Sequence, residues 1–286
     1  MCYTDNTKGD RPLTKEIRTV KFDTELEIEA YHFQGIMQKF PNHFHEYYVI
    51  GFIEAGRRHL SCKNQEYAIE PGDLLLFNPC DSHTCEQIDD NALDYRCINI
   101  QSDIMRKAVF EITGRDYLPY FTTQVVFHSD LVKLLRELHL LIMEDERDFI
   151  KDEIFLFFLK QLIEEFTEQE MSPPKSVQSA ETKIICDFIE KNYRKNISLD
   201  DLSRISGMSK YHLLRSFTKQ QGITPYSYLE TIRIDRAKKL LEQGVQPIDA
   251  ALQTGFADQS HFSNFFKKFI GLTPNQYRNI FKDKHD

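Results

Sequence analysis

The first hundred residues alternate short apolar runs with turn signals. Six runs rich in β-branched and aromatic residues cover positions 17–22, 26–33, 47–53, 57–62, 73–77 and 94–100. Turn-forming segments that contain Gly, Pro or Asn, such as 54–56, 71–73 and 78–79, separate several of these runs. Many short strands with regular punctuation are typical of a β-sandwich or a small barrel. The pattern therefore predicts a β-rich domain at the front of the chain.

Two amphipathic helices follow this β-rich region. Apolar side chains recur every three or four residues from 131 to 142 and again from 154 to 166. The stretch from Ile154 to Leu159 is apolar almost all round, so it must be buried on more than one side. Either the helix pair only covers the β-rich region, or it also forms a contact between two copies of the chain. A homodimer is therefore one of the assemblies that we expect.

A Pro- and Ser-rich segment separates the front of the chain from the tail. Residues 171–179 contain two prolines and three serines without a helical or strand pattern. Such a composition is typical of a linker between domains. The expected boundaries are 1–170 for the front domain, 171–180 for the linker and 181–286 for the tail.

The tail has a helical period interrupted by capping residues. It predicts helices at about 181–194, 199–206, 210–221, 225–242, 248–254 and 259–269. Ser198 and Asp258 are residue types that cap helix N-termini, and Gly207 and Gly244 are typical of C-terminal ends. Two short helices joined by a Gly-containing turn form a helix-turn-helix. The tail contains two such units, linked by the long helix 225–242.

The two units are copies of one pattern. Residues 209–228 and 258–277, which lie 49 positions apart, share 7 identities in 20 ungapped positions. An internal repeat of this kind shows one supersecondary unit used twice. In a helix-turn-helix the second helix presents its N-terminal residues to the major groove of DNA. Helices 210–221 and 259–269 are therefore the candidate reading helices.

Each reading helix has an inward and an outward face. The predicted inward residues are Leu213, Phe217, Phe262, Phe266 and Phe269. The predicted outward, DNA-contacting residues are Lys210, Tyr211, Leu214 and Arg215 in the first helix and Gln259, Ser260, His261 and Asn264 in the second. A solvated charged face is the alternative interpretation for Lys210 and Arg215 taken alone. The repetition of the same outward positions in the second unit favours DNA contact.

The charge of the chain is unevenly distributed. The net charge is −8, yet residues 182–286 contain 17 Lys/Arg against 11 Asp/Glu, a net of +6, which leaves −14 for residues 1–181. A basic tail joined to an acidic front is expected when only the tail meets phosphate. The six cysteines show no paired spacing, there is no apolar signal segment at the start, and no apolar run approaches membrane-spanning length. We expect a reduced, cytoplasmic protein without a membrane partner.

Three histidines in the front domain are candidates for a binding site. His43 and His45 are two positions apart, so on a strand they point to the same side, where His83 could join them. Together with Gly56 and the Pro71-Gly72-Asp73 turn, they resemble the two motifs of the cupin barrel. Cupin enzymes add a glutamate ligand, but this chain has Val49 and Ile50 where that residue would be expected. Metal ligands, polar lining of a small-molecule pocket and purely structural histidines remain three open interpretations.

The residues of the tail also form a dense, recognisable motif. They are Gly207-Met208-Ser209, Arg215, Phe217, Gly222, Thr224-Pro225, Tyr228, Arg233, Ala237, Leu240-Leu241, Gly255-Phe256, Asp258-Gln259-Ser260-His261-Phe262, Phe266-Lys267-Lys268, Gly271-Leu272-Thr273-Pro274 and Tyr277-Arg278. This set resembles the AraC/XylS family of bacterial transcription regulators, which usually carries a cupin-like front domain. Asn264 departs from the family pattern, because many members have arginine there, and Ser203 stands where alanine is usual.

The resemblance implies an α+β protein of two domains. The first would be a cupin-like β-barrel with two amphipathic helices that binds a small-molecule effector and forms a homodimer. The second would be an all-α domain whose two helix-turn-helix units enter adjacent major grooves of double-stranded DNA, about 34 Å apart. By position, Tyr211, Leu214 and Arg215 would face bases in the first unit. RNA polymerase is implied as a partner, because we expect an activator that touches the polymerase from a site near the promoter.

The effector itself is not identified by the sequence. The candidate ligand-binding residues of the front domain are Tyr31, His43, His45, Tyr47, His59 and His83. We expect no catalytic residue and no cofactor, with a metal on His43, His45 and His83 as the alternative. The competing hypothesis is a metal-binding cupin enzyme or sensor with an appended DNA-binding domain. Between the two readers, we expect the first to dominate affinity and its salt dependence and the second to adjust specificity.

Overall fold

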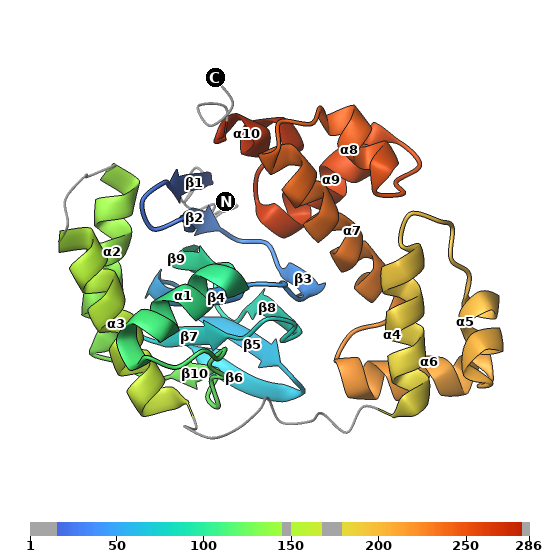
Figure 1. Cartoon of the computed structure of the whole chain (residues 1–286), viewed down its shortest axis with the longest axis horizontal. Coiled ribbons are helices and arrows are strands. Elements are labelled where there is room, and N and C mark those ends of the chain that lie inside the picture. The colour runs from blue at the N-terminus through green and yellow to red at the C-terminus, as the bar shows by residue number, and fades with distance from the viewer. Residues whose placement is uncertain (1–15, 145–149, 168–178, 282–286) are drawn as a thin grey trace, which may run out of the picture.

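The computed structural model describes residues 16–144, 150–167 and 179–281, and most of the expected linker at 171–180 lies outside this range. The described chain consists of a β-rich front domain, called the β-domain below, and a helical tail (Figure 1). Among the described helices, none is long and apolar enough to cross a lipid bilayer. The fold class predicted from the sequence is confirmed, with the corrections given below.

The β-domain contains two antiparallel sheets. The six-stranded sheet has the order β1 (Ile17–Asp23), β2 (Ile28–Ile36), β9 (Leu93–Ile100), β4 (Tyr48–Ala55), β7 (Leu74–Phe77) and β10 (Val125–Val126). The four-stranded sheet has the order β3 (Phe40–His43), β8 (His83–Gln87), β5 (Arg58–Cys62) and β6 (Gln65–Ile69). All six predicted strands are present. The expected barrel is not closed, because strand pairing stops at the edges of two separate sheets.

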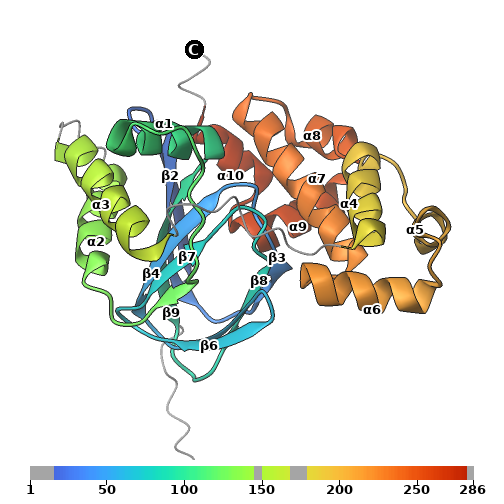
Figure 2. The ribbon, with the colours of Figure 1, turned by 60° about the horizontal axis from the view of Figure 1, so that its bottom comes forward.

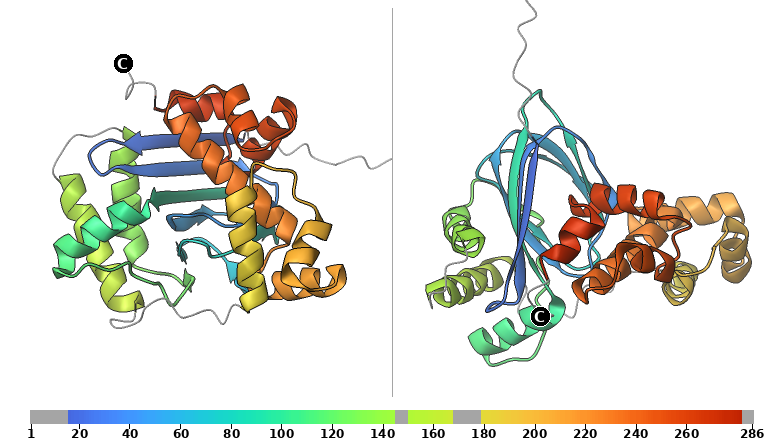
Figure 3. Two further views of the ribbon diagram at one scale, coloured as in Figure 1. Left: turned by 45° about the vertical axis from the view of Figure 1, so that its right-hand side comes forward. Right: turned by 90° about the horizontal axis from the view of Figure 1, so that it is seen from above.

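Alternation along the strands gives the six-stranded sheet two apolar faces. Ile50 and Phe52 on β4 pack under helices α1 (Ser102–Thr113), α2 (Leu131–Glu144) and α3 (Ile150–Phe166). Val49 and Ile53 on the same strand point to the opposite face, into the space between the sheets. Helix α1 is an addition to the two helices predicted from the sequence. The helices α2 and α3 lie on one side of the β-domain and the tail lies on the other (Figure 3).

The tail consists of seven helices within the described residues. They are α4 (Ala180–Asn192), α5 (Leu199–Ser206), α6 (Lys210–Gln221), α7 (Pro225–Glu242), α8 (Pro247–Gln253), α9 (Gln259–Ile270) and α10 (Pro274–Asn279). Ser198 forms a capping box with Asp201, and Gly207 ends α5 in the left-handed conformation with φ 66°. Asp258 caps α9 by accepting a hydrogen bond from the His261 N–H. The predicted helices and their caps are confirmed.

The two helix-turn-helix units have separate hydrophobic cores. The first unit encloses its own cluster around Ile185, Leu202, Leu213 and Phe217, which Phe44 of the β-domain joins at its edge. The core of the second unit is instead continuous with the side chains between the two sheets. Together they form one hydrophobic cluster. Its members include Phe262, Phe266 and Tyr277 of the tail and Tyr31, Val49 and Leu75 of the β-domain. The second unit is therefore packed onto the β-domain, whereas the first lies to the side (Figure 2).

Candidate functional site

The first reading helix, α6, presents the side chains predicted from the sequence. Leu213 and Phe217 are fully buried, so the opposite face is turned to solvent. Lys210, Tyr211, Leu214 and Arg215 are all exposed, and Tyr211 is 75% exposed. Lys210 pairs with Asp200 of α5, with 2.6 Å between Nζ and Oδ1. The positive charge that this face offers to a partner thus comes mainly from Arg215.

The second reading helix, α9, has the same arrangement without a positive charge at its start. Phe262 and Phe266 are fully buried in the unit. The outward residues Gln259, Ser260, His261 and Asn264 are exposed. The His261 ring contacts Phe256 and Phe265, with centroids 5.7 and 5.3 Å apart. The predicted contact positions of α9 therefore offer neither a lysine nor an arginine, and the exposed positive charges of this helix, Lys267 and Lys268, lie in its last turn.

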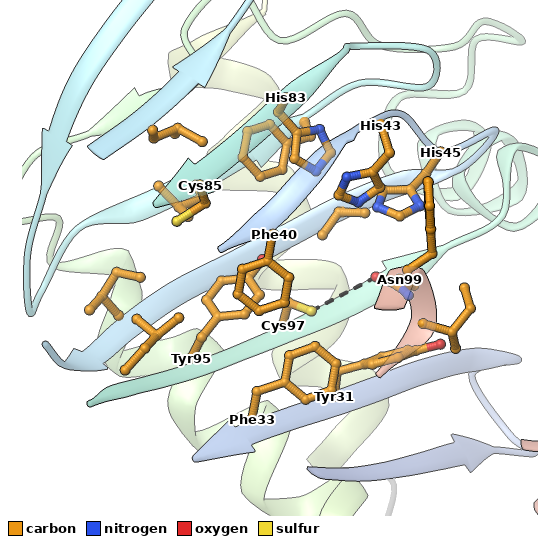
Figure 4. A pocket seen from close by; sticks show the side chains of 18 of the residues that line it. Tyr31, Phe33, Phe40, His43, His45, His83, Cys85, Tyr95, Cys97 and Asn99 are labelled. Atoms are coloured by element: carbon orange, nitrogen blue, oxygen red, sulfur yellow. Dashed lines mark hydrogen bonds between the residues drawn. The ribbon is translucent and has the colours of Figure 1, made fainter. Parts of the chain in front are cut away.

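A cavity of about 90 Å³ lies between the two sheets of the β-domain. Five of the six candidate ligand-binding residues line it, namely Tyr31, His43, His45, Tyr47 and His83. Figure 4 shows Tyr31 and the three histidines in the cavity wall. The structure does not bring His59 into this group. Strand alternation on β5 points Leu60 inward and His59 outward, where its Nε2 lies 3.1 Å from Glu66 Oε2. The sequence did not resolve the direction of this side chain.

The three histidines of the cavity form a compact cluster. One ring nitrogen from each of His43, His45 and His83 lies within 4.8 Å of the others. Burial lowers the pKa of His43 to about 3 and that of His83 to about 4, and it also lowers the pKa of His45 well below its usual value. All three imidazoles are therefore neutral near pH 7.

Backbone carbonyl groups fix the tautomers of two of these rings. The Nδ1–H of His43 donates to the Pro41 carbonyl at 2.7 Å, and the Nδ1–H of His83 donates to the Asp81 carbonyl at 3.0 Å. Because a carbonyl oxygen only accepts, each ring carries its proton on Nδ1 and an unshared electron pair on Nε2. These two nitrogens can accept a hydrogen bond or bind a metal ion.

The rest of the cavity wall is apolar or uncharged. The lining side chains that the sequence had not singled out include Phe40, Cys85, Tyr95, Cys97 and Asn99. Burial raises the pKa values of Cys85 and Cys97 to about 12, so both thiols stay protonated. The cavity lining, as far as the described residues define it, contains no Asp, Glu, Lys or Arg.

Two lining residues come from the tail. Phe269 and Ile270 form the last turn of α9 and close the cavity on the side of the second helix-turn-helix unit. The sequence predicted that Phe269 points inward, but not that it points into another domain. The run of apolar residues that continues from Phe269 through Ile270 to Leu272 was a signal, because one helix face does not need so many.

Charged groups hold the tail against the β-domain beside this cavity. Lys238 of α7 is buried and lies 2.6 Å from Glu29 Oε2 on β2. The Tyr277 hydroxyl donates to Glu29 and lies 2.7 Å from Glu242 Oε1. Glu46 pairs with Lys239 at 2.7 Å and with Arg236 at 3.1 Å. These contacts join α7 and α10 to the β-domain.

Comparison with known proteins agrees with both halves of the structure. Residues 25–157 match the family model of the AraC-like ligand binding domain, and residues 202–280 match a helix-turn-helix domain model. The uncharacterized HTH-type transcriptional regulator YbfI of Bacillus subtilis is 60% identical over 249 residues, which cover 87% of this chain and 90% of that protein. An uncharacterized HTH-type regulator of Staphylococcus aureus is 25% identical over 246 residues, but this chain spans only 31% of it.

A similar fold is found in a solved regulator. Unsaturated fatty acid bound ToxT from Vibrio cholerae is 18% identical and has a TM-score of 0.51, with 90% of this chain and 95% of that chain covered. An apo variant of ToxT with a single substitution has the same TM-score at 15% identity. The order of the two domains, the two helix-turn-helix units and the 60% identity to YbfI all indicate the same family. The chain belongs to the AraC-type family of transcriptional regulators, with a ligand-binding N-terminal domain and a helix-turn-helix DNA-binding domain.

Proposed function

We propose that this chain is a cytoplasmic activator controlled by an uncharged effector in the cavity, with α6 and α9 reading adjacent major grooves. The observation that carries the DNA-reading part is the exposure of all eight predicted contact residues above two buried helix faces. Arg215 is suited to bidentate contact with guanine and Gln259 to contact with adenine, each worth about 1–3 kcal/mol of discrimination. The eight exposed residues on α6 and α9 support a role in DNA binding, and therefore in the regulation of transcription.

A charge-matched pair of variants tests the reading helix. Arg215→Ala removes the exposed guanidinium from the middle of α6, and Lys219→Ala removes an exposed charge from the last turn of the same helix. We expect Arg215→Ala to abolish the site-specific footprint on an operator selected from random DNA, while Lys219→Ala retains it. Both variants should unfold at the wild-type temperature, because both residues are exposed. A normal Arg215→Ala footprint would remove α6 from the reading surface.

The proposed effector is an uncharged compound that carries a hydroxyl or another hydrogen-bond donor. The Nε2 atoms of His43 and His83 can accept a hydrogen bond, and the remaining wall is largely apolar. The fatty acid named for ToxT would bring a carboxylate, but no cationic side chain lines this cavity among the described residues. Burying an unpaired carboxylate is strongly unfavourable. This chemistry favours alcohols and phenols over acids.

Paired ligands test the effector class. We expect alcohols and phenols to raise the unfolding temperature of the full chain and carboxylates of the same carbon skeleton to leave it unchanged. Replacing His83 by Phe should weaken the response, and replacing both His43 and His83 by Phe should remove it, since the rings that accept the hydrogen bond are then gone while their aromatic volume is kept. A response to the carboxylates alone would contradict the proposed class.

Metal binding is a second candidate role, supported by the three histidine nitrogens within 4.8 Å. Three neutral imidazoles suit Zn²⁺, and the remaining coordination position would be open. Elemental analysis of the purified chain and titration with Zn²⁺ separate the two roles. One equivalent of metal that His83→Phe abolishes would replace the organic effector by a metal ion, whereas the effector proposal expects no stoichiometric metal.

We also propose a homodimer that contacts RNA polymerase when bound near a promoter. The dimer proposal is supported by Phe157 on α3, which is 52% exposed beside buried Phe158 and Leu159. The stretch from Ile154 to Leu159 is apolar almost all round, so this helix has to be buried on more than one side. Phe157→Glu should shift the sedimenting species from dimer to monomer without a loss of helical circular dichroism. Activation is checked by transcription in vitro with polymerase and the selected operator; a wild-type decrease in transcript would make the protein a repressor.

A further inference from the structure

The last turn of α9 forms part of the cavity wall. Phe269 is 8% exposed and Ile270 is 3% exposed, and both face the space between the sheets. On one side the Phe269 ring lies 5.3 Å from the ring of His43, and on the other it stacks on Phe265 with 5.2 Å between centroids. The Phe269 side chain thus contacts both a candidate effector-binding residue, His43, and the preceding turn of its own reading helix, at Phe265.

The close approach continues beyond the end of the helix. Gly271 ends α9 with φ 89°, and a Cβ atom at this position would lie 2.7 Å from Cζ of Phe33. Phe33 is itself a lining residue of the cavity. Only glycine fits this contact, both because of the positive φ and because of the space. The end of α9 is therefore fitted closely to the cavity wall.

The volume of the cavity limits the size of the ligand that can bind while Phe269 and Ile270 stay in place. Sites for ordinary small ligands measure about 300–1,000 Å³, and an engineered cavity of roughly 150 Å³ holds benzene. The space of about 90 Å³ is smaller than either. A metabolite of ordinary size therefore cannot enter while every lining side chain keeps its place.

The lining residues differ in how they are anchored. Most stand on strands that are paired within a sheet, such as β4 between β7 and β9. Phe269 and Ile270 instead belong to a different domain, which is held here by side-chain packing and by the ion pairs of Glu29 and Glu46. Their removal breaks no strand ladder. Among the described lining residues, these two can leave together as one unit.

We propose that Phe269 and Ile270 act as a stopper, and that an effector larger than the cavity binds by displacing them. This inference rests on the proposed role of the cavity as the effector site. Displacement of the stopper releases the end of α9 from the β-domain. Ligand binding and the position of the second reading helix are then linked, so that each affects the other to the same extent.

The linkage also assigns different roles to the two readers. The core of the first unit is separate from the cavity, so α6 keeps its position when the stopper leaves. The core of the second unit is continuous with the cavity, so α9 alone is moved. An effector thereby changes the relative placement of the two reading helices rather than the fold of either.

The test compares two alanine variants that enlarge the same cavity from different domains. Phe269→Ala removes the stopper ring, and Phe40→Ala removes a lining ring carried by β3. The probes are 1-octanol and 2-naphthol, which are uncharged hydroxyl compounds larger than the cavity. Affinity is measured by calorimetry, and release of α9 is measured by amide hydrogen exchange of residues 259–271 in the full chain.

In the wild type, we expect saturating probe to increase hydrogen exchange at the end of α9. Phe269→Ala should bind the probes about tenfold more tightly, because no buried ring has to be displaced, and the probe should no longer change exchange in α9. Phe40→Ala should also gain affinity but should keep the increase in exchange.

The outcomes separate the stopper from the site on which it depends. If the wild type binds the probes and α9 exchange is unchanged or reduced, the stopper is wrong while the cavity remains an effector site. Equal behaviour of Phe269→Ala and Phe40→Ala in the exchange measurement has the same meaning. Failure of the wild type and both variants to bind either probe overturns the proposed effector class together with the stopper.

Discussion

At the scale of single residues, Asp235 on α7 is an acid in an environment that disfavours its charge. It is buried, and its Oδ2 has no hydrogen-bond partner among the described residues. Burial, followed by the nearby carboxylate of Glu46, raises its pKa to about 7, against the opposing influence of Lys238, Lys239 and Arg236. The folded state therefore prefers the protonated acid, while the unfolded chain ionises near pH 3.8.

This shift predicts a pH dependence of stability. The contribution of Asp235 is fully present below about pH 4 and is lost as the pH rises towards 7, at about 1.4 kcal/mol per pH unit, because only the unfolded state is ionised in that window. Asp235→Asn should remove this slope. Denaturant unfolding at pH 5 and pH 8 measures it: the stability of the variant relative to the wild type should be higher at pH 8 than at pH 5. An equal difference at both values would contradict the raised pKa.

At the scale of the elements, the two reading helices differ in charge at their predicted DNA-contacting positions. Arg215 stands exposed on α6, whereas the outward residues of α9 are neutral hydrogen-bonding groups when His261 is unprotonated. Removing one cationic group that neutralises a phosphate changes the slope of log K against log[salt] by about 0.9. The Arg215 guanidinium is positively charged and lies close to phosphates whether it contacts a phosphate or a base. Its removal therefore lowers the slope of log K against log[salt], while the removal of a neutral group does not.

Binding measured across a salt series checks this division of roles. We expect Arg215→Ala to lower the salt slope by about one and Gln259→Ala to change base preference at its own position without changing the slope. Lys210→Ala should have a smaller effect than Arg215→Ala, because Asp200 already neutralises Lys210. Equal slopes for Arg215→Ala and Gln259→Ala would show that the readers are equivalent.

Element boundaries were predictable where local chemistry sets them. The bounds of α6 and α7 agree with the sequence prediction, because Ser209, Thr224 and Gly222 are caps that act within one turn. The strands β3, β6, β8 and β10 were not predicted, since each spans five residues or fewer and shows little alternation. The roles of Phe269 and His59 were also missed. Periodicity gives the face of an element, but not the domain against which that face packs.

At the scale of the whole molecule, a buried ion pair joins the domains. Lys238 and Glu29 lie 2.6 Å apart with side-chain exposures of 2% and 7%. The mutual attraction, together with the Tyr277 hydroxyl, compensates for the loss of hydration of the two charges. Removing one partner leaves an unpaired buried charge, which is costlier than removing both.

A double-mutant comparison follows from this pair. Lys238→Met should destabilise the chain by about 3–5 kcal/mol, because Glu29 is left charged in a buried site. Lys238→Met combined with Glu29→Gln should recover a large part of that loss. Unfolding by denaturant provides both values. A double variant less stable than Lys238→Met would show that the pair is not the source of the effect.

The separate cores of the two helix-turn-helix units have a thermodynamic consequence. A unit that shares a large core with the β-domain gains cooperativity from it, whereas a unit whose smaller core takes only Phe44 from the β-domain gains less and opens first. Heating should therefore produce two calorimetric transitions, with residues 180–224 unfolding before the remainder. The first helix-turn-helix unit would then lose its contact with DNA while the second unit stays folded. Mild heating would therefore weaken DNA binding before the whole protein unfolds.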